Sequence, residues 1–319
     1  MKKIVQPIVV LLIVSFVVVA GLLALRKKDE NISIVTTNFP SYDFARAITK
    51  GIPDANIKML VSPGVEIHDY EPTPQDIIDI KNSDYFIYTG GESDHWVENI
   101  LNNINPDQTK VIRLIDLVET KEDEPISGPE ENHDHEDDHH HSDIDEHVWT
   151  SLRNSIKIIQ ALEKEFISQN PDEPKYSQNA TSYINELELI DNDIQEIVKN
   201  AKLKTLVFGD RFPLRYFVDD YGLDYYAAFP GCSERTEASA STIAFLVDIV
   251  KAKKIPVIFH IELSDGEIAS EIAKSTGAKV LEFHSAHNIS KNDFDSGVTY
   301  AEIMRKNLNA LKEALNESY

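Results

Sequence analysis

Histidine is concentrated in one acidic stretch of the chain. Five of the eleven histidines fall between Asn132 and Ser142, among aspartates and glutamates. They are His133, His135, His139, His140 and His141. Neutral imidazole and carboxylate suit divalent cations such as zinc, and no cysteine lies nearby. The stretch that leads to Ile144 is too polar to build a core, so we expect a solvated surface loop that binds metal weakly and exchanges it fast.

Three further histidines stand at predicted element ends. His68 comes after a predicted strand at residues 57–61, and His284 directly follows one at residues 279–283. His147 ends the acidic loop, two residues before a predicted helix. In open parallel sheets, ligands bind beyond the carboxyl ends of the strands. We therefore predict that His68, His147 and His284 meet as metal ligands in one crevice.

A tetrahedral zinc site needs a fourth ligand besides three imidazoles. Asp210 follows a predicted strand at residues 205–208 and is the best-placed carboxylate, although an aspartate there could equally cap the next helix. Glu262, after a predicted strand at residues 256–260, and His287 are alternate ligands. Imidazole-rich ligation favours Zn²⁺ over Mn²⁺, whose sites contain more carboxylate oxygen.

The elements that position these residues follow a repeating pattern. Predicted strands and helices alternate in both halves of the chain, which indicates parallel sheets. Between the halves, apolar residues recur every 3.6 residues from Tyr176 to Ile197 without glycine or proline. We predict an α/β fold of two lobes with parallel βα sheets, joined by one long rigid helix. The expected boundaries are residues 31–170 for the N-terminal lobe, including a His-rich acidic loop at 120–146, residues 171–202 for the helix, and residues 203–319 for the C-terminal lobe.

Charge and hydropathy limit the partners and the location. A formal charge of −23 argues against a nucleic-acid partner, because two polyanions repel. The single cysteine excludes an intramolecular disulfide. Residues 8–25 form an uncharged apolar run with basic residues on both sides. We expect residues 1–30 to be a membrane anchor or a cleaved signal segment, and the remainder to be extracytoplasmic, anchored to the cell membrane by the N-terminal helix or secreted if it is cleaved.

Two motifs resemble those of a known family. HDYEPTPQD at residues 68–76 and DEHVWTS at residues 145–151 are similar to the ligand motifs of zinc/manganese-specific solute-binding proteins of bacterial metal-uptake ABC transporters. The resemblance implies a metal held between two lobes and delivered to a membrane permease driven by an ATPase. The sequence departs from the family at Gly209, which stands where the family commonly has a third histidine, and at His284, where a carboxylate is usual. No lipobox cysteine follows the apolar run.

We therefore predict that the protein is extracytoplasmic and is not an enzyme. We expect it to capture Zn²⁺ in an interlobe cleft and to deliver the ion to an ABC permease. One alternative is a zinc-dependent hydrolase with Glu262 or Asp210 as general base, although the sequence contains no HExxH motif. Another is a surface adhesin or zinc buffer, which would bind several metal ions weakly and none tightly.

Overall fold

The computed structural model describes residues 32–68, 70–122, 144–231 and 238–316. The predicted anchor and the five histidines of the acidic loop lie outside these ranges. Within them, no helix is long and apolar enough to cross a membrane.

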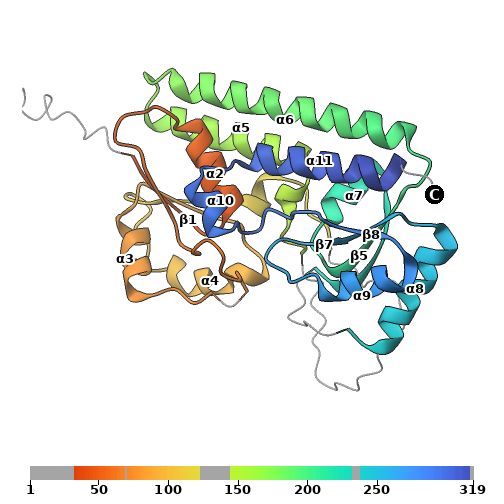
Figure 1. Cartoon of the computed structure of the whole chain (residues 1–319). Coiled ribbons are helices and arrows are strands. Elements are labelled where there is room, and N and C mark those ends of the chain that lie inside the picture. The colour runs from red at the N-terminus through yellow and green to blue at the C-terminus, as the bar shows by residue number, and fades with distance from the viewer. Residues whose placement is uncertain (1–31, 69, 123–143, 232–237, 317–319) are drawn as a thin grey trace, which may run out of the picture.

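Two four-stranded parallel sheets form the centres of the two lobes, as predicted (Figure 1). The strand order is β2-β1-β3-β4 in the first sheet and β6-β5-β7-β8 in the second. The sheets therefore have the same topology, although the two halves of the sequence show no repeat. The strands are β1 (Ser33–Thr36), β2 (Asn56–Met59), β3 (Tyr85–Tyr88), β4 (Lys110–Arg113), β5 (Thr205–Phe212), β6 (Asp224–Pro230), β7 (Val257–His260) and β8 (Lys279–Glu282).

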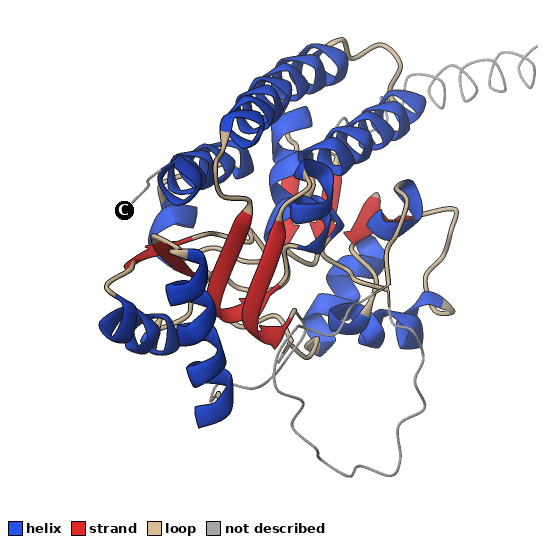
Figure 2. Cartoon of the chain, turned by 90° about the vertical axis from the view of Figure 1, so that its right-hand side faces the viewer, coloured by secondary structure: helices blue, strands red, loops and turns tan. Residues whose placement is uncertain are grey.

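Helices lie on both sides of the strands (Figure 2). In the N-terminal half they are α2 (Phe39–Ile48), α3 (Pro74–Asn82), α4 (His95–Leu101), α5 (Leu152–Gln169) and α6 (Lys175–Asn200), with short 3₁₀ turns η1 (Glu92–Asp94), η2 (Leu114–Leu117) and η3 (Val148–Thr150). In the C-terminal half they are α7 (Arg215–Tyr221), α8 (Ala240–Lys253), α9 (Glu267–Thr276), α10 (Lys291–Asp295) and α11 (Tyr300–Asn316).

Helix α6 is the long connecting helix that the apolar period predicts. One face of it is fully or nearly buried, from Tyr176 through Leu187 to Val198. It runs along the top of the molecule beside α5 and α11 and spans both lobes (Figure 1). Because its buried face belongs to one apolar cluster that extends from Ile34 to Leu315, the helix fixes the two lobes to a shared core.

The loop between β2 and α3 carries His68, and its far end is fixed by helix capping. Thr73 accepts a hydrogen bond from the backbone N–H of Asp76, while the Asp76 carboxylate accepts from the backbone N–H of Thr73. Pro74 occupies the first turn, where its missing N–H costs nothing. This reciprocal cap fixes the residue at which α3 begins, and therefore the residue at which the loop that carries His68 ends.

Candidate metal centre

Three side chains from distant parts of the chain converge where the lobes meet. His68, Glu146 and His287 each offer a ligand atom, and these atoms all lie within 4.8 Å of one another. With His147, the two histidines line a cavity of about 20 Å³, room for roughly one water-sized ligand. Ligands that bind zinc at 2.0–2.1 Å lie about 3.4 Å apart, so small side-chain movements would complete a coordination shell.

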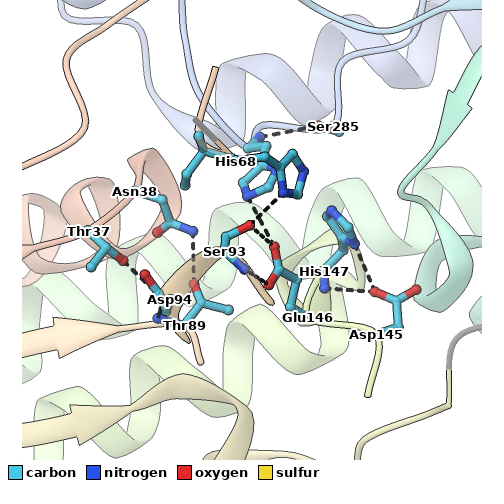
Figure 3. A network of polar contacts seen from close by, with 12 residues as sticks. Thr37, Asn38, His68, Thr89, Ser93, Asp94, Asp145, Glu146, His147 and Ser285 are labelled. Atoms are coloured by element: carbon cyan, nitrogen blue, oxygen red, sulfur yellow. Dashed lines mark hydrogen bonds and ion pairs between the residues drawn. The ribbon is translucent and has the colours of Figure 1, made fainter. Parts of the chain in front are cut away.

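A serine between His68 and Glu146 sets the tautomer of the imidazole (Figure 3). The Ser93 hydroxyl donates to Glu146 Oε1 and lies 3.0 Å from His68 Nδ1. Because a hydroxyl has one proton to donate, it must accept from His68 Nδ1–H. The lone pair of His68 is therefore on Nε2, the nitrogen left for a metal.

The turn before α4 holds Ser93 in this position. Asp94 Oδ2 accepts from the backbone N–H of Gly90 at 3.0 Å, and burial raises the pKa of Asp94 to about 7. Gly91 has a φ of +100°, and a Cβ there would lie 2.6 Å from the Cβ of Glu146. Only glycine fits both the backbone conformation and the space, so the close approach of Glu146 depends on it.

His147 is oriented by the residue two positions before it. Asp145 Oδ1 accepts from the His147 backbone N–H at 2.8 Å and from its Nδ1 at 2.9 Å. This arrangement places the lone pair of the ring on Nε2. Metal-binding histidines commonly donate their other ring N–H to a carboxylate in the same way. The ring centroid of His147 lies 5.0 Å from that of His287. The indole of Trp149 donates to the carbonyl of Ser285 at 2.9 Å and so holds this segment against the C-terminal lobe.

Burial favours the neutral form of His68 and of His287. Burial lowers the pKa of His68 and outweighs the carboxylate of Glu146, which raises it. Burial also lowers the pKa of His287, to well below its usual range, with smaller contributions from His147 and His68. Because an imidazole must be neutral to bind a metal, these shifts favour binding.

His284 makes a contact that differs from the predicted one. Its side chain is not part of the converging group, because Nδ1 accepts a hydrogen bond from the backbone N–H of Ala286 at 2.9 Å. Ala286 has a φ of +63°, which is unusual for a residue with a Cβ. His284 thus stabilises the turn after β8, and that turn brings His287, the alternate ligand, into the cleft.

Glu262 also supports this turn. Its carboxylate accepts from the backbone N–H of Ser285 at 2.6 Å, from the Ser285 hydroxyl at 2.5 Å and from the backbone N–H of His287 at 3.0 Å. Three hydrogen-bond donors therefore engage the carboxylate of Glu262, which was predicted as an alternate metal ligand. The segment from Ser285 to His287 is fixed by them.

Asp210 joins two strands. Its Oδ2 accepts from the backbone N–H of Ile261 at 3.2 Å, and its Oδ1 accepts from that of Arg211 at 2.8 Å. The structure places it neither among the converging ligands nor at a helix cap, since α7 begins after Leu214. In the structure Asp210 therefore connects β5 to the residue that follows β7.

Packing explains the departure at Gly209. Strand β5 shifts register between Phe208 and Arg211, and Gly209 lies within this shift. A Cβ on Gly209 would lie 2.5 Å from the Cα of Ala269 in α9, so no larger side chain fits. A histidine at this corner is sterically excluded, whereas His287 reaches the cleft from the turn after β8.

The end of the acidic loop is not solvated as predicted. Asp145 and Glu146 are buried, as is His147, which was predicted to lie in the crevice. Glu122 and Ile144 form an antiparallel bridge, so the ends of the acidic segment meet close to the centre. Sequence reasoning missed Glu146 because it read this residue as part of the loop. The available signal was its place directly before His147 in the second motif.

A buried group of imidazoles and a carboxylate between two parallel-sheet lobes, with a long helix across both, defines a two-lobed metal-binding protein. Comparison with known proteins gives the family. The chain belongs to the ZnuA family, described as zinc-uptake complex component A, periplasmic, whose model matches residues 34–314. Proteins of this family are solute-binding components of transport systems.

The relatives are zinc-binding proteins of bacteria. The chain is 30% identical over 294 residues to the zinc-binding lipoprotein AdcA of Streptococcus pneumoniae, covering 92% of this chain and 57% of AdcA. It is 30% identical over 296 residues to the high-affinity zinc uptake system protein ZnuA of Bacillus subtilis, covering 90% and 89%. The Zn(II)-bound ZnuA-like domain of S. pneumoniae AdcA has a similar structure, with a TM-score of 0.73 at 27% identity over 90% of this chain and 100% of that domain.

Proposed function

We propose that this protein captures Zn²⁺ between its two lobes and delivers it to a membrane permease driven by an ATPase. The observation that carries the proposal is the convergence of His68, Glu146 and His287, of which the two histidines line a cavity of about 20 Å³. The family and the zinc-binding relatives support zinc as the cargo.

In the proposed site, His68, His147 and His287 bind the ion through imidazole nitrogen and Glu146 supplies a carboxylate oxygen. Three nitrogens and one oxygen suit tetrahedral Zn²⁺ better than Mn²⁺, which prefers oxygen-rich sites. Ser93 and Asp145 orient two of the imidazoles before the metal arrives. This preorganisation supports tight binding, because little side-chain entropy is left to lose.

We further propose that the His-rich acidic segment collects cations for this site. The bridge between Glu122 and Ile144 supports the idea, because it brings both ends of the segment close to Asp145 and His147. A negative segment next to a cleft raises the local concentration of cations. Residues 1–30 are proposed to hold the protein at the outer face of the membrane.

The hydrogen bonds of the cleft do not favour a hydrolase, because they engage the carboxylates suggested as its general base. A metal hydrolase needs a general base beside the metal. Glu262 and Asp210 were the two carboxylates suggested for that role, and both accept hydrogen bonds from backbone N–H groups. These carboxylates support the fold of the C-terminal lobe and leave the binding function as the better proposal.

A competitive zinc titration of three proteins tests the proposal. We expect the intact protein and a variant without residues 132–142 to bind one tight equivalent, and the intact protein to bind further weak ones. His68→Ala should lose the tight equivalent. Tight binding that survives His68→Ala but not the loop deletion would contradict the proposed site.

A further inference from the structure

The segment that carries His68 is hydrogen-bonded to the segment that carries His287. The Asn288 amide donates to the carbonyl of Ser62 at 2.9 Å and to that of Val65 at 2.7 Å. The backbone N–H of Gly64 donates to the carbonyl of Ile289 at 2.8 Å. These three bonds join a loop of the N-terminal lobe to a loop of the C-terminal lobe.

The orientation of the Asn288 amide is defined by its surroundings. Its Oδ1 accepts from the backbone N–H of Ile289 at 2.8 Å, so the NH₂ group must face the two carbonyls. Asn288 is 4% exposed, and each of its bonds is therefore largely shielded from water. Buried donors and acceptors are costly to leave unpaired, which favours the joined arrangement.

A charged pair reinforces the same contact. Arg211, from β5 of the C-terminal lobe, donates through Nη2 to Glu66 Oε2 at 2.8 Å. Glu66 lies two residues before His68, and Arg211 lines the same cavity as the proposed histidine ligands. We call the Asn288 amide bonds, the Gly64–Ile289 backbone bond and the Arg211–Glu66 pair the interlobe clasp.

On both sides of the cleft, residues of the clasp are close in sequence to the proposed ligands. Asn288 directly follows His287, and Glu66 is separated from His68 by one residue. Moving His68 away from His287 therefore requires these bonds to break. A metal in so small a cavity leaves only when its ligands separate or the walls move, so the clasp opposes release.

We propose that the interlobe clasp sets the rate at which the bound metal leaves, with Asn288 and Arg211 as positioning residues that do not touch the ion. The inference rests on the proposed zinc site and assigns its release step. Loss of two buried hydrogen bonds in Asn288→Ala should raise the dissociation rate by about tenfold or more.

The experiment loads full-length protein with Zn²⁺ and follows its transfer to a chromogenic chelator by stopped flow. Asn179→Ala is the matched control, because the Asn179 amide also donates to two carbonyls, those of Ile48 and Lys50, both at 2.9 Å. This control should release zinc at the wild-type rate. The absorption spectrum of the Co²⁺ form should be the same in Asn288→Ala and wild type, because the ligands are unchanged.

Arg211→Gln separates the clasp from simple electrostatics. Removing a positive charge beside a cation would by itself slow release, whereas breaking the clasp speeds it, and we expect release to become faster. Rates within twofold of wild type for Asn288→Ala, or slower release from Arg211→Gln, would overturn the clasp while leaving the zinc site in place. A wild-type protein with no tight zinc would instead overturn the proposed function.

Discussion

The two sides of the cleft use their polar residues differently. On the N-terminal side, His68 and His147 each have one ring nitrogen engaged by a neighbour, Ser93 or Asp145, which directs the other towards a metal. On the C-terminal side, Asp210, Glu262 and His284 bind the backbone of their own lobe. Glu262 and His284 both hold the turn from Ser285 to His287, and His287 alone joins the converging group.

This difference shows why position at a strand end does not define a ligand. All these residues follow a parallel strand or begin a helix, and the topology brings them to one region. Whether a side chain reaches the metal depends on the hydrogen bonds that it makes first. The Glu262 carboxylate accepts from three donors of the Ser285–His287 turn and stabilises that turn. By contrast, the Glu146 carboxylate accepts from the backbone and side chain of Ser93 and lies among the converging residues.

The largest expected effect separates His287 from His284. His287→Ala should weaken zinc binding by more than a hundredfold, because it removes an entire ligand and the only one from the C-terminal side in the part of the chain that the structure describes. His284→Ala should weaken it by about tenfold, through the loosened turn. Competitive titration measures the loss of zinc affinity in both variants. An equal loss, or a larger loss in His284→Ala, would contradict the proposed difference between the two histidines.

Asp145→Asn should have the next largest effect. It removes the charge of the group that accepts from His147 Nδ1 and keeps the size of the side chain. Loss of such an orienting carboxylate typically costs 10- to 100-fold in metal affinity. Zinc titration checks the loss, and Asp193→Asn, on the exposed side of α6, is the control. Unchanged affinity in Asp145→Asn would show that the N-terminal side is not preorganised as described.

A smaller effect is expected for Glu262→Gln. The amide keeps one acceptor oxygen, so the turn loses part of its support and the metal ligands all remain. We expect a decrease in zinc affinity of roughly three- to tenfold, with about 1–3 kcal/mol less stability from the buried group left unpaired. Thermal unfolding and zinc titration on the same samples test both. A loss as large as that of His287→Ala would mean that Glu262 binds the metal itself.

The smallest effect on metal affinity is expected for Asp94→Asn. This substitution should instead change the stability of the folded protein. Burial raises the pKa of Asp94 to about 7 in the folded protein, from an unfolded value near 4. The folded state then binds the proton more tightly, so the wild type loses stability as pH rises from 4 to 7. Asp94→Asn should be more stable than wild type at pH 8, by roughly 2–4 kcal/mol, with a smaller difference at pH 5. Denaturant unfolding at the two pH values measures this, and a difference that does not change with pH would contradict it.

The sequence predicts the fold well because the fold depends on patterns. Alternating elements indicate the parallel sheets, and the apolar period between Tyr176 and Ile197 indicates α6, which the structure confirms. The region of the site is also predictable, since parallel strands end at one edge. The proposed choice of His287 over His284 is not predictable from the sequence, because it depends on a turn with a positive φ at Ala286. Glu146 and Asn288 depend on contacts between segments far apart in the chain.

The central claim is that the metal is bound by His68, His147, Glu146 and His287, with one ligand from the C-terminal lobe. Anomalous diffraction at the zinc edge from crystals of the zinc-loaded protein tests it most directly. We expect one strong peak within bonding distance of these four side chains and none at His284. A peak bonded to His284 or Glu262, with His287 turned away, would contradict it.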